Sequence, residues 1–328
     1  MEEKVRMKKG ICLTALYPQA MENAELLLEL FEKVKEKERF DCVEFYFHGK
    51  PEEELRIGKK LKQLQLASVF LAGFPMKRDT VDLSAGCDEI RKKGVADCLK
   101  LYESAARMQA DKMLILSGPA WEMQDGKSRD GILLQMQNSL QEMEAWLWQD
   151  GPQITLEFFN DKGEPWLAVG DVAMVQELFG GMPETKIGIT FDTSHAAQLG
   201  WDVLPAFRML QPWIRHLHLA NSVSREKRHP LFGDKHPLFS IEGGDFSLAR
   251  IRKLYRTLEQ SGDLEQVDIC SFEVISRGEE ELYFERTCEE AAYVWEQEGG
   301  GKLWHVGNYE SKESLGMKET MKAGKGAG

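Results

Sequence analysis

The sequence predicts a (β/α)8 barrel, a closed parallel sheet with one helix after each strand. Short apolar runs rich in β-branched and aromatic residues alternate along the chain with longer amphipathic segments. Several of these runs end in carboxylates or imidazoles, as expected where barrel strands open onto a catalytic face. The alternative is an open doubly wound sheet, but no Gly-x-Gly-x-x-Gly follows the first predicted strand. The closed barrel is therefore the favoured fold.

Each predicted strand is a short apolar run bounded by polar or turn-forming residues. The eight runs cover residues 9–17, 40–48, 66–73, 113–117, 153–159, 187–195, 215–221 and 267–274.

The segments between the runs carry apolar residues at the spacing of a helix with one buried face. They cover residues 21–37, 51–64, 90–109, 133–148, 172–179, 202–210, 245–262 and 279–296. Pro51 is suited to the first turn of the second helix. Asp202 and Asp245 are expected to cap the sixth and seventh helices, and Gly262 to end the seventh.

We expect residues 1–297 to form a single barrel domain and residues 298–328 to form a C-terminal tail or arm. A chain of 328 residues with 42% apolar content is long enough for one large domain. Trp304 and Tyr309 are candidate anchors of the tail, on the barrel or on a neighbouring subunit. A homo-oligomer is expected, with a hetero-oligomer as the alternative.

The composition narrows the class of partner. A formal net charge of −12 disfavours nucleic acid, because an acidic surface repels the phosphodiester backbone. We find no signal peptide and no apolar run of membrane-spanning length, so no membrane partner is expected. The six cysteines include no Cys-x-x-Cys pair. These features predict a cytoplasmic enzyme with reduced thiols.

Four consecutive predicted strands each carry one side chain suited to bind a metal ion. These are Glu157, Asp192, His218 and Glu273. The carboxyl ends of barrel strands meet at one rim, so the four side chains are expected to converge. One such residue alone would favour an ordinary surface position, whereas four in succession favour a metal site. Three carboxylates and one imidazole suit a single divalent cation, with Mn²⁺ favoured and Mg²⁺, Co²⁺ or Zn²⁺ as alternatives.

The motifs around these residues resemble the xylose isomerase-like barrel superfamily. They are Leu156-Glu-Phe-Phe-Asn160, Phe191-Asp-Thr-Ser-His195, His216-Leu-His218 with Arg225, and Glu273, supported by the segment 94–116. Their order and spacing are most similar to ketose 3-epimerases of the D-tagatose and D-psicose type. The resemblance covers residues 8–297.

The resemblance implies a divalent-metal-dependent sugar isomerase or epimerase, with the four residues as ligands. In such enzymes a cation stabilises an enediolate, and two glutamates act as acid–base groups, here Glu157 and Glu273. It also implies that His195 and Arg225 contact substrate oxygens. The alternatives are support of a metal ligand for His195 and a solvated loop charge for Arg225.

Asn160 and Trp121 are further candidate substrate-binding residues near the strand ends. Trp121 belongs to a group of aromatic residues expected near this rim. They either pack in the core or in a lid or, where several face the metal, stack on a sugar ring or on an attached aglycone. The group comprises Tyr17, Tyr46, Phe74, Trp121, Phe159 and Trp166.

Two other functions use the same ligands. A carbanion beside a carbonyl can expel a β-substituent, which gives a lyase, a dehydratase or a C-glycoside deglycosidase acting on a keto sugar. A non-catalytic sugar-binding barrel is the third hypothesis. Asp234 and His236 resemble the Asp-x-His motif of the superfamily's AP endonucleases, but the other histidines of those nucleases are missing. Hydrogen bonds that order the loop are therefore the preferred role for this pair.

Overall fold

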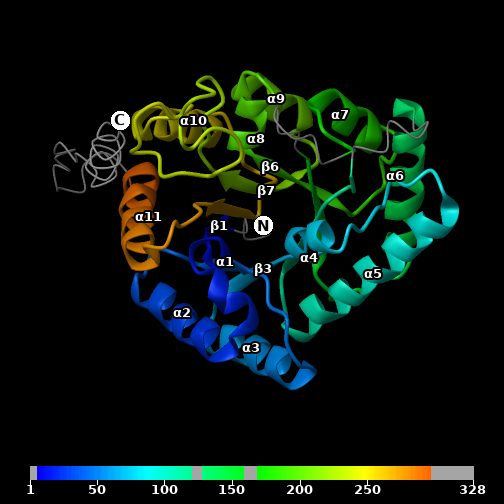
Figure 1. Ribbon diagram of the computed structural model, residues 1–328, viewed down its shortest axis with the longest axis horizontal. Helices are drawn as coiled ribbons and strands as arrows, with labels where there is room; N and C mark the ends of the chain where they lie inside the picture. The colour runs from blue at the N-terminus through cyan, green and yellow to red at the C-terminus, as the bar shows by residue number, and fades with distance from the viewer. Residues whose placement is uncertain (1–5, 120–127, 159–167, 297–328) are drawn as a thin grey trace, which may run out of the picture. The chain divides into compact units, whose positions relative to one another are not determined.

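The computed structural model describes residues 6–119, 128–158 and 168–296. The chain divides into two compact units, Met1–Trp295 and Glu296–Gly328. The first unit contains eight parallel strands that close into a barrel in chain order, with helices on the outside (Figure 1). The predicted (β/α)8 fold is confirmed. The expected tail, residues 298–328, lies outside the described residues.

The strands are short, and each pairs in parallel with the strands before and after it in the chain. They are β1 Lys8–Cys12, β2 Cys42–Phe45, β3 Ala67–Leu71, β4 Lys112–Ile115, β5 Gln153–Glu157, β6 Gly188–Asp192, β7 Ile214–Leu219 and β8 Ile269–Phe272. The pairing of β1 with β8 closes the barrel and removes the exposed edges of the sheet.

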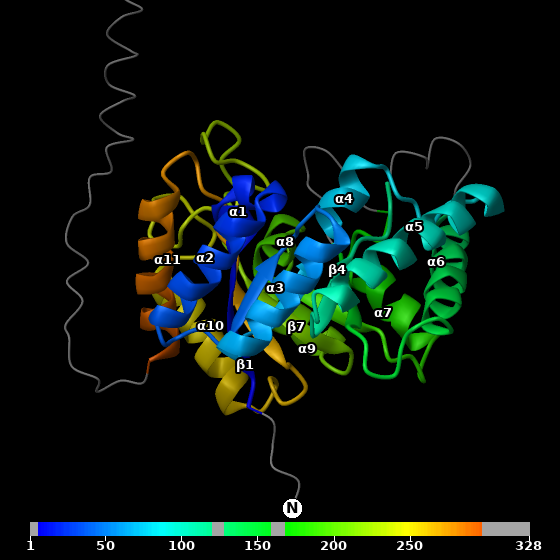
Figure 2. The same ribbon diagram turned by 90° about the horizontal axis from the view of Figure 1, so that it is seen from below.

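Long helices pack outside the strands, and shorter ones follow several strand ends. The long helices are α2 Ala24–Glu36, α3 Pro51–Leu64, α5 Asp88–Arg107, α6 Arg129–Glu144, α7 Val172–Gly180, α9 Val203–Leu210, α10 Leu248–Gln260 and α11 Glu280–Trp295. The shorter ones are α1 Leu13–Leu16, η1 Pro18–Glu22, α4 Gly73–Arg78 and α8 Thr193–Gln198. Figure 2 shows α1 and α4 at the upper end of the barrel, where the strands end.

Aromatic side chains join the sheet to its outer layer of helices. Phe45 of β2 meets Phe31 of α2 with ring centroids 5.3 Å apart. Phe272 of β8 meets Trp295 of α11 at 5.0 Å. Burying one side chain of this size contributes about 1.5–3 kcal/mol, so these contacts fix each helix on the strand it covers.

The observed strands end earlier than the predicted runs, and in two of the runs the last three or more residues belong to a short helix or its C-terminal cap. The run 9–17 is a strand only to Cys12, and residues 13–16 form α1. The run 187–195 is a strand only to Asp192, because Oδ1 of that residue accepts the backbone N–H groups of Ser194 and His195 and begins α8. His195 therefore lies on a short helix directly above the strand ends.

The predicted caps need correction. Ser247 caps α10 by accepting the N–H of Arg250, whereas Asp245 accepts the hydroxyls of Ser222 and Ser224. Asp202 occupies the N-cap position before α9, as predicted, but its side chain makes no capping hydrogen bond. Gly262 follows the end of α10 with φ +79°, a left-handed conformation that glycine adopts without strain.

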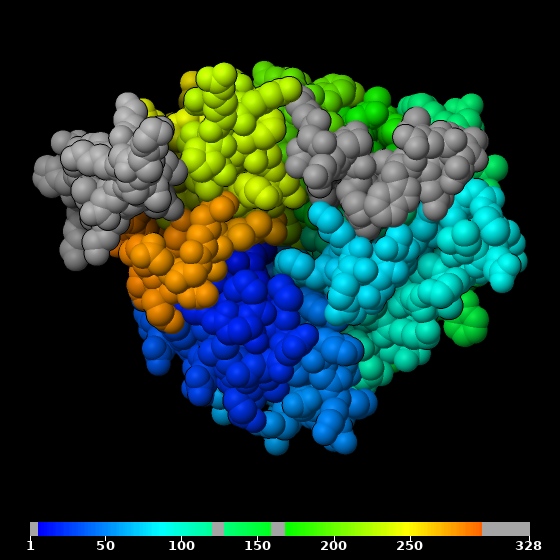
Figure 3. Space-filling model, in the orientation of Figure 1, coloured from blue at the N-terminus to red at the C-terminus, as the bar shows by residue number. Residues whose placement is uncertain are grey.

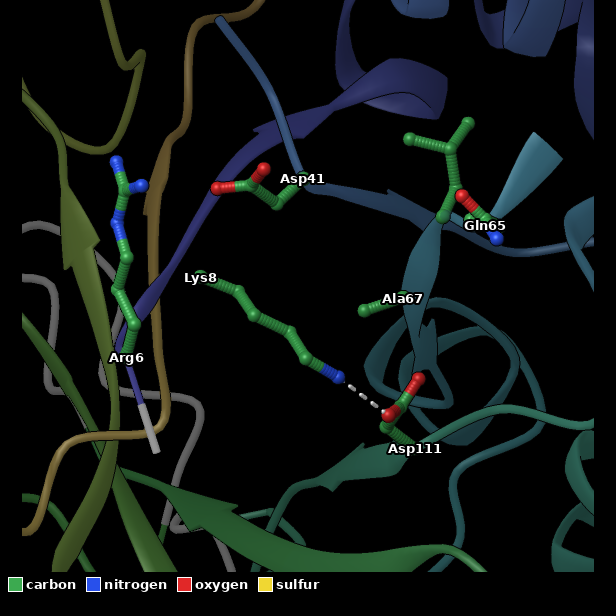
Figure 4. A pocket seen from close by; sticks show the side chains of 7 residues that line it. Arg6, Lys8, Asp41, Gln65, Ala67 and Asp111 are labelled. Atoms are coloured by element: carbon green, nitrogen blue, oxygen red, sulfur yellow. Dashed lines mark hydrogen bonds and ion pairs between the residues drawn. The ribbon is translucent and has the colours of Figure 1, made fainter. Parts of the chain in front are cut away.

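One pocket of about 430 Å³ lies at the opposite end of the barrel (Figure 4). Lys8, Ala67 and Asp111 line it from the beginnings of β1, β3 and β4, and Lys8 Nζ pairs with Asp111 Oδ1 at 2.8 Å. Active sites of (β/α)8 barrels lie at the carboxyl ends of the strands, so we assign this pocket no catalytic role. Within the described residues, no helix has the length and apolarity needed to cross a bilayer.

Candidate metal centre

The four predicted ligands lie together at the carboxyl ends of β5 to β8. Glu157, Asp192, His218 and Glu273 each offer one ligand atom, and these atoms all lie within 4.8 Å of one another. The pairing of β6 with β7 sets Asp192 directly beside His218. Figure 3 shows a hollow in this face between α1 in blue, α4 in cyan and the orange residues after β8.

Buried polar atoms of this cluster fit a divalent cation. Among the described residues, Glu157 Oε1 and Asp192 Oδ2 are buried without a hydrogen-bond partner, and His218 Nδ1 lies 2.9 Å from Glu273 Oε2 without favourable hydrogen-bond geometry. Such atoms carry a desolvation cost unless something binds them. Three carboxylates close together also repel one another, which a cation would offset. The donor set of three carboxylate oxygens and one imidazole nitrogen matches the preferences of Mn²⁺ and Mg²⁺ and is also met by Zn²⁺.

Asp192 divides its two oxygens between the fold and the site. Oδ1 accepts the N–H groups of Ser194 at 2.6 Å and His195 at 3.2 Å. Oδ2 faces His218 Nδ1 at 3.6 Å. Because Oδ1 is held by the backbone of α8, the orientation of Oδ2 toward the cluster is fixed by the local chain.

The His218 ring is held from its other side by Glu44 of β2. His218 Nε2 lies 3.0 Å from Glu44 Oε2, and His216 Nε2 lies 2.8 Å from Glu44 Oε1. Glu44 and His216 have no exposed surface, and His218 is 1% exposed. Burial raises the pKa of Glu44, but the two imidazoles outweigh it and hold that pKa well below its usual value.

The two glutamates proposed as acid–base groups differ in surroundings. Burial raises the pKa of Glu157 above its usual value. Burial acts in the same direction on Glu273, but the imidazoles of His236 and His218 outweigh it and lower the pKa of that residue. The pKa values of the two carboxyl groups are therefore shifted in opposite directions.

Two further histidines and an aspartate border the cluster. His195 Nε2 lies 3.8 Å from Glu157 Oε1, and His195 Nδ1 lies 3.6 Å from Asp234 Oδ1. His236 Nδ1 lies 3.3 Å from Glu273 Oε2, while its Nε2 is 2.6 Å from Asp234 Oδ1. His236 has φ +37°, an uncommon backbone conformation for a residue with a side chain.

The other predicted substrate-binding residues lie elsewhere. The Arg225 side chain is 80% exposed, with Nε 3.7 Å from Asp245 Oδ1, and the structure does not bring it to the four ligands. Asn160 and Trp121 lie outside the described residues, as do Phe159 and Trp166. Tyr17 and Tyr46 are buried, and Phe74 is 40% exposed.

Sequence reasoning missed Glu44 and underrated His236. Glu44 lies within the apolar run 40–48, and a carboxylate at such a position needs a buried partner, which was the available signal. His236 does pair with Asp234 within its loop, as expected, but its Nδ1 also lies 3.3 Å from Glu273 of the candidate metal centre. His236 lies in the long loop between β7 and α10, which has no helical or strand periodicity from which the direction of its side chain could be predicted.

Comparisons with known proteins agree with this fold. The family model for the xylose isomerase-like TIM barrel matches residues 31–289. No curated protein matches the chain in sequence.

Several solved structures share the barrel. A D-tagatose 3-epimerase-like protein has a TM-score of 0.65 at 18% identity, covering 88% of this chain and 98% of its own. The 3-keto-D-glucoside 4-epimerase YcjR from E. coli has a TM-score of 0.64 at 17% sequence identity, and the match covers 88% of this chain and 99% of YcjR. A probable 3-DHS dehydratase, AsbF from Bacillus anthracis, has a TM-score of 0.60 at 16% sequence identity, and the match covers 89% of this chain and 100% of AsbF. At such identities the structural likeness establishes the fold only. The family match, which covers most of the barrel, shows that this chain belongs to the xylose isomerase-like TIM barrel family.

Proposed function

We propose that this protein is a divalent-cation-dependent sugar epimerase or isomerase. The observation that carries the proposal is the grouping of Glu157 and Glu273 with Asp192 and His218, one atom from each within 4.8 Å of the others. Two carboxylates at one cation can serve as a pair of acid–base groups for a sugar bound there. Solved structures with this fold include proteins described as sugar epimerases.

The chain's own groups account for the proton transfers. One glutamate takes the proton from the carbon beside the substrate carbonyl, and the other returns a proton to the same carbon from the opposite face. The configuration of that carbon is inverted, and the carbon skeleton is retained. A bound cation would supply Lewis-acid stabilisation of the negative charge that develops on the substrate oxygens.

The remaining residues are proposed to bind the cation and to orient the substrate. Asp192 and His218 complete the ligand set, each fixed by a second contact to the barrel. We assign to His195 a hydrogen bond to a substrate oxygen, a role supported by its position beside Glu157, where it is 3% exposed. The Arg225 side chain is exposed and pairs with Asp245, so its proposed role requires that the side chain leave Asp245.

A lyase or dehydratase, including a C-glycoside deglycosidase, is the second candidate function. The same proton abstraction leads to elimination when the neighbouring carbon carries a leaving group. The likeness to a probable dehydratase of this fold favours keeping this candidate. A non-catalytic sugar-binding barrel is the third.

Solvent exchange separates these functions. Purified protein with Mn²⁺ is incubated with ketoses and 3-keto glycosides in D₂O, and the products are followed by NMR and mass spectrometry. Deuterium at one carbon with an intact skeleton supports the epimerase or isomerase. Loss of a substituent supports the lyase, and binding without exchange supports the sugar-binding barrel.

A further inference from the structure

We propose that Glu44 is a positioning residue for the cation centre, acting through His218. The inference rests on the proposed cation centre but concerns a residue that touches neither cation nor substrate. Glu44 lies on β2 and His218 on β7, two strands that are not neighbours in the barrel. Their contact therefore crosses the barrel interior, directly below the ligand cluster.

The hydrogen bond from His218 fixes which of its nitrogens can bind a metal. Nε2 lies 3.0 Å from a carboxylate oxygen of Glu44 and so carries the proton, since a carboxylate accepts. In the neutral ring Nδ1 then holds the lone pair, and it faces Glu273 at 2.9 Å, Glu157 at 3.4 Å and Asp192 at 3.6 Å. A metal ion requires that unprotonated nitrogen.

No other strong acceptor replaces Glu44 among the described neighbours of His218 Nε2. Cys12 Sγ lies 4.0 Å away, and burial raises the pKa of that thiol well above its usual value, so it stays neutral. His218 is 1% exposed and Glu44 has no exposed surface, which leaves little room for water to substitute. The tautomer of His218 therefore depends on this one carboxylate.

Glu44 is itself immobilised. Its other oxygen accepts from His216 Nε2 at 2.8 Å, and His216 Nδ1 lies 3.1 Å from the hydroxyl of Thr190. That hydroxyl is 2.8 Å from the hydroxyl of Thr155. A buried chain of hydrogen bonds thus runs from β5 through β6 and β7 to β2. The His216 and His218 rings meet edge to face, with centroids 4.5 Å apart, which further limits rotation of His218.

The test is the affinity of the substrate-free protein for Mn²⁺, measured by calorimetry or electron paramagnetic resonance. Glu44→Gln presents an N–H group to one of the two imidazole N–H donors, so one ring must rotate or change tautomer. We expect the dissociation constant for Mn²⁺ to rise about 10- to 100-fold. Glu54→Gln is the matched control, because Glu54 is a buried carboxylate of α3 that pairs with Arg107 away from the centre. This control should leave the Mn²⁺ affinity unchanged.

A folded Glu44→Gln variant that binds Mn²⁺ as tightly as the wild type would overturn the proposal. If the variant does not fold, the wild type loaded with Zn²⁺ decides the matter by ¹⁵N NMR of its imidazoles. A proton on Nε2 of His218 supports the proposal, and a proton on Nδ1 overturns it. A wild type that binds no divalent cation would instead refute the cation centre itself. None of these measurements depends on sugar turnover. Failure of the positioning role is therefore distinguishable from failure of the proposed epimerase activity.

Discussion

Glu273 Oε2 lies 2.9 Å from Nδ1 of His218, between two imidazoles, since His236 Nδ1 is 3.3 Å from the same oxygen. The oxygen of a proposed acid–base group thus touches both a proposed metal ligand and a loop histidine. This arrangement links the chemistry of the site to the loop between β7 and α10.

Removal of divalent cations with a chelator should abolish activity and lower the melting temperature. The three carboxylates repel one another without a cation, and a cation that binds only the folded state stabilises it. At 100 times its dissociation constant, Mn²⁺ should add about 2.7 kcal/mol to the free energy of unfolding. Activity assays and thermal melts before and after reloading measure both effects. Full activity of demonstrably metal-free protein would refute the cation centre.

His236→Gln should lower kcat by about tenfold with a smaller effect on KM, because the substitution loosens the Glu273 carboxylate without removing it. His229→Gln is the control, since His229 lies in the same loop and accepts the backbone N–H of Leu231. Steady-state kinetics on both variants provide the comparison. Equal kinetics of His236→Gln and the wild type would show that the contact with Glu273 does not affect turnover.

A buried carboxyl group in α11 predicts a pH-dependent stability. Burial raises the pKa of Glu290 to about 7 from 4.5, despite backbone N–H groups of Phe239 and Ser240 that donate to its oxygens. A raised pKa favours the protonated form in the folded state. The contribution to stability is therefore complete below pH 4.5 and is lost as the pH rises through about 7. The shift corresponds to about 3 kcal/mol.

Glu290→Gln should remove this contribution to the pH dependence. Urea unfolding of the wild type and the variant between pH 5 and pH 8 measures this contribution. We expect the free energy of unfolding to decline less with rising pH for Glu290→Gln than for the wild type. Parallel curves for the two proteins would show that Glu290 does not titrate as proposed.

Truncation after Glu298 should leave a folded barrel, because the compact unit ends at Trp295. Truncation before Trp295 should destabilise it by about 3–5 kcal/mol, since the ring of Trp295 packs on Phe272 and Phe40. Circular dichroism and urea unfolding separate the two products. Sizing shows whether residues 299–328 contribute to assembly. An unfolded product of the truncation after Glu298 would show that the tail is needed for the core.

The fold and the grouping of the four candidate ligands were predictable from the sequence because they depend on local pattern. Apolar runs reveal buried strands, and a polar residue at the end of each run reveals the rim. The short helices α1 and α8 were not predicted, since their residues continue the apolar runs of the preceding strands. Only the side chain of Asp192, by accepting two backbone N–H groups, ends β6 where it does.

Contacts between distant strands were beyond the sequence pattern. Glu44 and His218 are 174 positions apart, and their meeting depends on the diameter of the closed barrel rather than on any local signal. Likewise, His236 reaches Glu273 only because its loop folds back over the strand ends. Residues 120–127 and 159–167, which include Trp121 and Asn160, lie outside the described structure, so their proposed roles stay predictions.

The most direct test of the central claim is position-specific deuterium exchange by Glu157→Gln and Glu273→Gln in D₂O with saturating Mn²⁺. Each variant keeps one carboxylate and loses the other, so it can exchange a proton on one face of the sugar but cannot complete inversion. We predict deuterium in the starting ketose from at least one variant, with no epimer formed by either, while the Glu54→Gln control behaves as the wild type. Epimer formation at the wild-type rate by both variants would contradict the two-glutamate mechanism.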